Sequence, residues 1–191
     1  MPPKVKITGE DILTAALDLV REAGEAALNA RALARRLGCS TQPIFCHYSS
    51  MEALREAVLS AGYGLYHRSL QSAMKSDKYP AYKASGMHYV SFAVREPQLF
   101  CWLFMRERSM GEQQAGFSSL DEEVLVVLMQ MLGTTREEAE RFHFTMWMWV
   151  HGVATSVATG FLAFDEEMIS ACLSNVYFGL REQLKKEKEH E

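Results

Sequence analysis

Three arginines and a short uncharged stretch beside them are the residues of this chain most suited to chemistry with a partner. Residues 26–51 contain Arg31, Arg35 and Arg36 and no acidic residue, whereas the whole 191-residue chain has a net charge of −4. A local excess of positive charge in an acidic chain is a place where a polyanion can dock. The adjoining stretch 38–48, GCSTQPIFCHY, offers amide, hydroxyl and imidazole groups that can hydrogen-bond to base edges and phosphates.

Enzyme chemistry is less well supported by the sequence. It contains no Gly-x-Ser-x-Gly motif, no Walker-type loop and no Cys-x-x-Cys pair among its four cysteines, which we expect to be free thiols. Glu140 and His143 have the Glu-x-x-His spacing of di-iron carboxylate bundles, but the second such pair, Glu187 and His190, lies in a charged tail. A di-iron enzyme is therefore an alternative that metal analysis would settle. We expect no catalytic residue, no metal and no cofactor.

The elements that position the basic stretch are predicted to be helices. Hydrophobic residues make up 48% of the chain and recur at three- and four-residue spacing, while prolines and glycines are few. This pattern predicts an all-α fold. No apolar run approaches the roughly 20 residues of a bilayer span, and the N-terminus has no leader-like apolar region, so we expect a cytoplasmic protein without a membrane segment.

Local signals define the first two helices. Thr8 is a good N-cap with Asp11 as its capping-box partner, and Gly24 is placed to end the first helix. The second helix is predicted to run from an Asn29 cap to Gly38, with Arg31, Arg35 and Arg36 facing outward.

The uncharged stretch is predicted to be the start of a third helix. Ser40 can cap it, Pro43 then falls in the first turn, where its missing N–H is not needed, and Ile44 and Tyr48 face inward. Thr41 and Gln42 would face outward. Two short helices joined by a glycine turn are typical of a helix-turn-helix that reads the major groove, although a purely structural helical hairpin gives the same spacing.

Residues 7–58 resemble the N-terminal DNA-binding domain of the TetR family of transcriptional regulators. The matching features are the Ile12 and Ala15-Ala16 opening, Gly24, the Leu33 to Ser40 segment, the His47-Tyr48 pair, and Glu52-Ala53-Leu54 at the start of a fourth helix. The resemblance implies DNA contacts from the following residues, with Lys4, Lys6 and the helix N-termini as further phosphate contacts: Asn29, Arg31, Arg35, Ser40, Thr41, Gln42, Pro43, Phe45, His47 and Tyr48.

Two positions depart from the family pattern. Phe45 stands where the family usually has a tyrosine, and Met51 where it usually has a lysine, and both usual residues contact phosphates. Each change should remove one backbone contact and reduce the salt dependence of DNA binding. A helical adaptor of the same fold that has lost DNA binding therefore stays an alternative.

The remaining two-thirds of the chain is predicted to hold a ligand. A helix from Met51 to about Met74, loosened at Gly62 and Gly64, leads out of the DNA-binding part, and a polar loop is expected over about 109–119. The stretch 147–152, WMWVHG, is similar to the Trp…His-Gly signature in one branch of TetR C-terminal domains. That resemblance implies a cavity for an apolar or aromatic ligand, with these wall candidates: Met87, His88, Phe92, Phe100, Phe104, Met131, Phe142, Met146 and Trp149.

The last two helices are predicted to form a homodimer interface. The helix over 137–164 has apolar residues on two sides and so should be buried on both. The final helix, from 165 to about 188, has a single apolar stripe before its charged tail. Two such helices per subunit suit a four-helix interface. The residues expected in it are Trp147, His151, Ala154, Ala158, Phe161, Ile169, Leu173, Val176 and Leu180.

Together these observations predict an all-α, TetR-like fold of about nine helices. We expect a DNA-binding domain at 1–52, a connecting helix at 53–75 and a ligand-binding and dimerisation domain at 76–191. The expected function is that of a dimeric repressor released from a palindromic operator on double-stranded DNA by a small-molecule effector.

Overall fold

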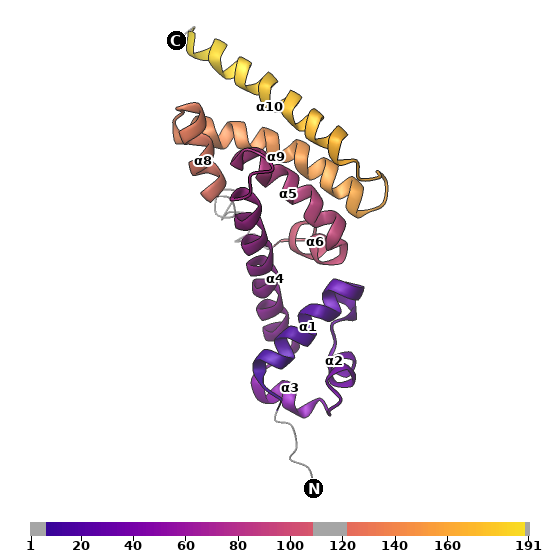
Figure 1. Ribbon diagram of the computed structural model, residues 1–191. Coiled ribbons are helices and arrows are strands. Elements are labelled where there is room, and N and C mark those ends of the chain that lie inside the picture. The colour runs from indigo at the N-terminus through magenta and orange to yellow at the C-terminus, as the bar shows by residue number, and fades with distance from the viewer. Residues whose placement is uncertain (1–6, 109–121, 190–191) are drawn as a thin grey trace. The chain divides into compact units, whose positions relative to one another are not determined.

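The computed structural model describes residues 7–108 and 122–189, and every described regular element is a helix (Figure 1). The all-α prediction of about nine helices is confirmed, because nine α-helices and one 3-10 helix occur within these ranges. The expected polar loop, Lys4, Lys6 and His190 lie outside the described residues. None of the described helices combines the length and apolar character that a membrane crossing requires. The bounds are α1 Gly9–Ala23, η1 Glu25–Ala27, α2 Ala30–Leu37, α3 Gln42–His47, α4 Met51–Met74, α5 Ala81–Arg95, α6 Pro97–Phe104, α8 Glu122–Leu132, α9 Arg136–Ala158 and α10 Glu166–Glu189.

The chain divides into two compact units. The first consists of Met1–Arg68 and Glu96–Arg106, and the second of Ser69–Arg95 and Glu107–Glu191. Helix α4 begins in the first unit and ends in the second, and α6 belongs to the first. The division by function at residues 52 and 75 stays a prediction.

The caps of the first two helices follow the local sequence. The Thr8 hydroxyl accepts a hydrogen bond from the Asp11 amide, the Asp11 carboxylate accepts one from the Thr8 amide, and Gly24 ends α1, which confirms the predicted capping box. The Asn29 side chain caps α2 by accepting from the Ala32 amide at 3.0 Å. Gly38 ends α2 with φ of +64°, a left-handed conformation that glycine adopts without strain.

Helix α4 is continuous, which corrects the prediction that Gly62 and Gly64 loosen it. A Cβ on Gly62 would lie 3.1 Å from side-chain atoms of both Leu99 and Leu103 of α6. The Tyr63 hydroxyl donates to the Leu103 carbonyl at 2.7 Å. The glycine therefore allows α6 to approach α4 closely, and this packing holds the helix together where propensity alone would weaken it.

The second unit is built around α5, which is buried on most of its surface and packs against α8, α9 and α10. Figure 1 shows α9 and α10 running beside each other, in orange and yellow. On α9 the buried residues repeat at four-residue spacing, namely Phe142, Met146, Val150 and Ala154. The outer side of α9 is exposed in the single chain, with Phe144 at 51% and Met148 at 53%, so its burial in a dimer interface stays a prediction.

Helix α9 also ends earlier than predicted. It stops at Ala158, because Gly160 has φ of +73° and turns the chain. Phe161 therefore lies in the connection to α10, where it is 82% exposed. Asp165 precedes α10 and its carboxylate accepts from the Met168 amide at 3.0 Å, so it caps the final helix.

Candidate functional site

Helix α3 exposes small polar and aromatic groups around one buried anchor. Ile44 is fully buried, whereas Gln42, Phe45, Cys46 and His47 are exposed. The helix begins at Gln42 rather than after Ser40, which corrects the predicted cap. Thr41 takes the N-cap position in a helical conformation and makes no side-chain cap, and Pro43 occupies the first turn as predicted.

The turn between α2 and α3 completes a helix-turn-helix. The Cys39 amide donates to the Ala34 carbonyl at 3.0 Å, and the Gly38 amide donates to the Arg35 carbonyl at 3.2 Å. These bonds satisfy the last carbonyls of α2 and fix the direction in which α3 departs. Figure 1 shows α1, α2 and α3 grouped in the N-terminal part of the chain.

The three arginines of α2 differ in their surroundings. Arg31 and Arg35 are exposed, and neither makes an ion pair with another described residue. Arg36 instead donates two hydrogen bonds of 2.7 Å to the carboxylate of Glu22 in α1. Its Nη2 also lies 3.7 Å from a carboxylate oxygen of Asp18. The Arg36 guanidinium lowers the pKa of Glu22. The prediction of three available cations is therefore wrong for Arg36, whose charge is paired with Glu22 at the surface, and two arginines are left for a polyanion.

His47 and Tyr48 both contact the start of α1. The Tyr48 hydroxyl donates to the Gly9 carbonyl at 3.3 Å, and His47 Nε2 lies 3.2 Å from the Ile7 carbonyl. If Nε2 carries the proton that this carbonyl accepts, the Nδ1 of a neutral ring has only a lone pair. A phosphate contact through Nδ1 then requires the imidazolium form.

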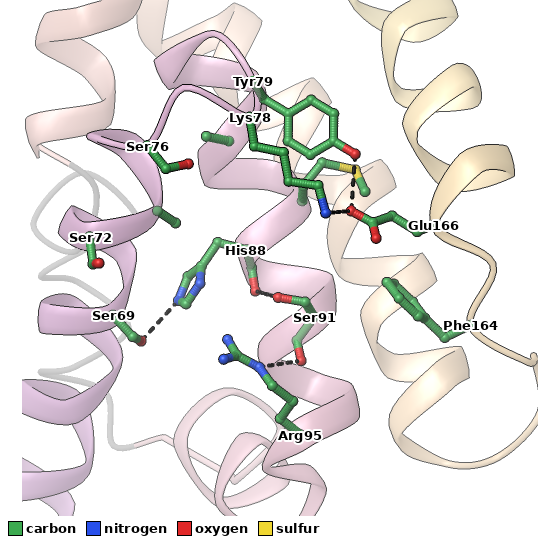
Figure 2. A pocket seen from close by; sticks show the side chains of 13 residues that line it. Ser69, Ser72, Ser76, Lys78, Tyr79, His88, Ser91, Arg95, Phe164 and Glu166 are labelled. Carbon is green, nitrogen blue, oxygen red and sulfur yellow. Dashed lines mark hydrogen bonds and ion pairs between the residues drawn. The ribbon is translucent and has the colours of Figure 1, made fainter.

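A cavity of about 450 Å³ lies in the second unit (Figure 2). It is bordered by the end of α4, the residues that follow α4, one face of α5, and the residues around the start of α10. Serine hydroxyls, charged groups and apolar side chains all contribute to its wall. The lining residues are Ser69, Ser72, Ala73, Ser76, Lys78, Tyr79, Ala84, Met87, His88, Ser91, Arg95, Phe164 and Glu166.

Polar contacts organise two parts of this cavity. On the α5 side, the Ser69 hydroxyl lies 3.1 Å from His88 Nε2, and Arg95 Nε donates to the Ser91 carbonyl at 3.3 Å. On the α10 side, Lys78 and Tyr79 both bind the Glu166 carboxylate, the tyrosine hydroxyl at 3.0 Å. The Lys78 ammonium and then the Tyr79 hydroxyl lower the pKa of Glu166, and Glu166 raises the pKa of Lys78.

The predicted ligand-wall residues are not brought together. Met87 and His88 line the cavity, but Phe92, Phe142 and Met146 are core residues of the second unit and Met131 is 47% exposed. Trp149 is partly buried on α9. Phe100 and Phe104 belong to the first unit, where their rings pack 5.2 Å apart.

Sequence reasoning did not single out most of the residues that line this cavity. A usable signal was the series Ala84, His88, Ser91 and Arg95, which repeats at helical spacing within an otherwise apolar helix. The polar residues of this series line the cavity, whereas the rest of α5 is mostly core.

The predicted interface residues divide into inner and outer groups. Ala154, Ile169 and Leu173 are buried inside the subunit, and a Cβ on Gly86 of α5 would lie 3.1 Å from Leu173. His151 stacks on Trp147 at 4.6 Å, and its Nδ1 lies 2.9 Å from the Tyr89 hydroxyl. Burial lowers the pKa of His151, with a smaller effect from Arg108. Ala158, Val176 and Leu180 are half-buried.

The exposed apolar residues of this region share only Phe161 with the predicted interface. They lie on the outer side of α9, on the connection, and on α10, and they are Phe144, Met148, Phe161, Leu162, Phe164, Met168 and Phe178. Exposed clusters of large apolar side chains mark contact surfaces.

The Glu140 and His143 pair is engaged elsewhere. Glu140 accepts from Arg136 at 2.9 Å, and His143 Nδ1 lies 3.0 Å from the Tyr82 hydroxyl. Within 7–108 and 122–189, no group of three or more His, Cys, Asp or Glu residues is placed to hold a metal ion.

Two family models match the chain. Residues 12–58 match the model of bacterial regulatory proteins of the tetR family, and residues 82–174 match the tetracyclin repressor-like C-terminal domain. The first matches the helix-turn-helix, and the second matches the chain from α5 through α9 and the first part of α10. A comparison with curated proteins finds no match.

Solved structures share the fold at low identity. A TetR-like transcriptional regulator from Rhodococcus sp. RHA1 is 17% identical with a TM-score of 0.63, over 93% of this chain and 96% of that one. A protein from Pseudomonas aeruginosa PAO1 described as a transcriptional regulator is 19% identical with a TM-score of 0.67, over 92% and 93%. A glutamine-to-alanine variant of TetR from Acinetobacter baumannii AYE, in complex with minocycline, is 15% identical with a TM-score of 0.58, over 95% and 98%.

Proposed function

The chain belongs to the TetR family of transcriptional regulators, and we propose that it is a dimeric repressor that leaves a palindromic operator when a small molecule binds the cavity of its second unit. The observation that carries this proposal is the exposed face of α3, together with two arginines of α2 that pair with no other residue in the described part of the chain. Ile44 anchors the helix, and Gln42 and its neighbours remain available to a partner.

The exposed groups suit sequence reading. A glutamine can bind adenine through two hydrogen bonds, and a threonine can offer its hydroxyl or its methyl group to a base edge. Arg31 and Arg35, exposed on the preceding helix, would bind phosphates and set the register without reading sequence. DNA binding by α3 and α2 thus divides between base contacts from Thr41 and Gln42 and backbone contacts from the arginines, Asn29 and His47.

A homodimer would place two α3 helices on one duplex. The exposed apolar side chains of α9, α10 and their connection support such an interface, because large apolar side chains are seldom left in water in this number. The half-sites would then be separated by about 34–36 Å, one helical turn of DNA.

Effector release is supported by the cavity and by α4. This one helix contributes Ser69 and Ser72 to the cavity and begins in the first unit, next to the DNA-reading elements in sequence. A ligand that binds one conformation of the second unit more tightly shifts the dimer away from DNA by that difference in affinity and no more. The relative solved with minocycline supports a small-molecule effector as a class.

Selection of bound duplexes from a random pool tests the proposal. We expect the purified protein to enrich a palindrome. Gln42→Ala should change the preferred base at one position of each half-site, whereas Arg35→Ala should weaken all sequences alike. An unchanged preference for Gln42→Ala would contradict the groove assignment, and no enrichment at low salt would favour the adaptor.

A further inference from the structure

We propose that the effector is a small organic carboxylate, with its carboxylate held by Arg95 and its apolar body against Ala84, Met87 and Phe164. This inference rests on the proposed function and names the ligand class of the same cavity. It arises from the charges and hydroxyls that line the cavity and from their existing partners.

The acidic group of the cavity is already neutralised. Glu166 binds the Lys78 ammonium and accepts from the Tyr79 hydroxyl at 3.0 Å, so these three residues form a closed set. The same contacts hold Glu166 in its charged form, since they lower its pKa. A cationic ligand would therefore meet the two lining cations without an available carboxylate to offset them.

Arg95 is the cation that remains. Only its Nε is engaged, with the Ser91 carbonyl, and its outer nitrogens have no partner among the described residues. Figure 2 shows its side chain on the α5 side of the cavity, the side of His88 and Ser69, with Phe164 and Glu166 across from it. A guanidinium offers two parallel N–H donors to one carboxylate, a geometry that a neutral or cationic ligand cannot use.

Two further hydroxyl donors line the same cavity. The Ser72 and Ser76 hydroxyls have no side-chain hydrogen bond within the described part of the chain, and both line the cavity. Each can donate to a carboxylate oxygen. Arg95 is one cation without a counter-ion, and the hydroxyls are neutral, so the cavity suits a ligand with a single negative charge. A dianion would have one of its two charges buried without a partner.

The apolar residues of the lining set the rest of the ligand. Ala73, Ala84, Met87 and Phe164 supply apolar surface, and methionine adapts to irregular shapes. A volume of about 450 Å³ is within the usual range for small-molecule sites. The ligand is therefore an amphipathic monocarboxylate with an aliphatic or aromatic body.

Calorimetric titration of the full chain with matched probes tests this class. The probes are decanoate and 4-phenylbutyrate, their uncharged amides, and decylamine as the cation. We expect at least one carboxylate to bind about 10-fold more tightly than its amide, with decylamine weaker than either, and the preference to fall with added salt. Equal binding of acid and amide, or no binding by either carboxylate, overturns the proposal.

Three variants locate the charge. Arg95→Gln should reduce the preference for the acid to near unity, whereas Lys75→Gln, which removes an exposed cation outside the cavity lining, should leave it unchanged. Glu166→Gln should tighten carboxylate binding, because it removes the partner of Lys78. A full acid preference in folded Arg95→Gln, judged by an unaltered circular dichroism spectrum, overturns the assignment to Arg95.

Operator release is measured separately, on the selected duplex. If a carboxylate binds through Arg95 but leaves operator occupancy unchanged, the ligand class holds and the repressor-release proposal fails. If the amides release the operator as well as the acids do, the release proposal holds and the ligand class fails.

Discussion

Arg21 near the end of α1 and Glu96 just before α6 form a two-point ion pair within the first unit. Arg21 Nε lies 2.9 Å from one carboxylate oxygen and Nη2 lies 2.6 Å from the other. The two residues are 75 positions apart, and the Glu96 side chain is only 17% exposed. Hydrogen bonding to Glu96 raises the pKa of Arg21. The pair links the start of α6 to α1, the first helix of the DNA-binding region.

Breaking this pair should destabilise the first unit. We expect Arg21→Ala to lower the free energy of unfolding by roughly 1 kcal/mol, a modest value because the arginine is partly exposed and screened. Urea denaturation measures the change. Arg141→Ala removes a more exposed pair with Glu187 and serves as the control, with a smaller effect expected. Equal effects of the two variants would argue against a special role for Arg21.

Substitutions of Arg35 and Arg36 should differ in their effect on the salt dependence of DNA binding. Arg35→Ala should reduce the slope of log affinity against log salt by about 0.9, the loss of one phosphate contact on duplex DNA. Arg36→Ala should leave that slope nearly unchanged and lower stability instead, because its guanidinium is held by Glu22. Fluorescence anisotropy over a salt series gives the slope, and a fall of similar size for Arg36→Ala would contradict the structure.

Restoring the usual family residues should strengthen backbone binding. Phe45 is 48% exposed on α3 and Met51 opens α4, so both positions can accept a polar group. Met51→Lys should steepen the salt slope by about 0.9, and Phe45→Tyr should raise affinity for all sequences with little change in preference. Met51→Gln is the uncharged control. A slope that Met51→Lys leaves unaltered would place this residue away from DNA.

Charges on the outer side of α9 should separate the subunits. Phe144 and Met148 are about half exposed, and a carboxylate there would be buried without a partner in a dimer. Met148→Glu should raise the dimer dissociation constant by roughly 100-fold, or ~2–3 kcal/mol. Analytical ultracentrifugation tests this, with a substitution of the exposed Val126 of α8, Val126→Glu, as the control. An unaffected dimer would move the interface elsewhere.

The stability of the second unit should fall in mild acid through His151. Burial lowers its pKa below the ordinary 6.5, so the unfolded chain takes up a proton before the folded chain does. Stability is therefore full above pH of about 6.5 and is lost as the pH falls from there toward the lowered pKa. Urea denaturation at several pH values measures this loss. We expect His151→Gln to flatten that part of the profile.

Local chemistry made the helix ends of the DNA-reading part predictable. The side chains of Thr8 and Asn29 cap helices within three residues of themselves, and Gly24 and Gly38 end them, so neighbouring residues carry the whole signal. The family resemblance extended this to the helix-turn-helix. The prediction of Ser40 as the cap was wrong because the N-cap position of α3 is Thr41. Its side chain makes no capping hydrogen bond, so the sequence carries no side-chain signal for it.

Contacts between distant residues could not be predicted in the same way. The use of Arg36 depends on Glu22, 14 residues away, and the continuity of α4 depends on α6 packing over Gly62. The cavity is lined by residues between positions 69 and 166 of the chain. Phe92, Phe100 and Phe142, which were predicted to line it, are buried in the core instead. Periodicity shows that a face is apolar, but it does not show which element will cover that face.

Arg95 and Glu96 are consecutive residues with opposite charges and separate tasks. Arg95 lines the cavity, and Glu96 holds α1 through Arg21. The boundary between the two compact units therefore falls on the peptide bond that joins a cavity residue to a residue that anchors α1.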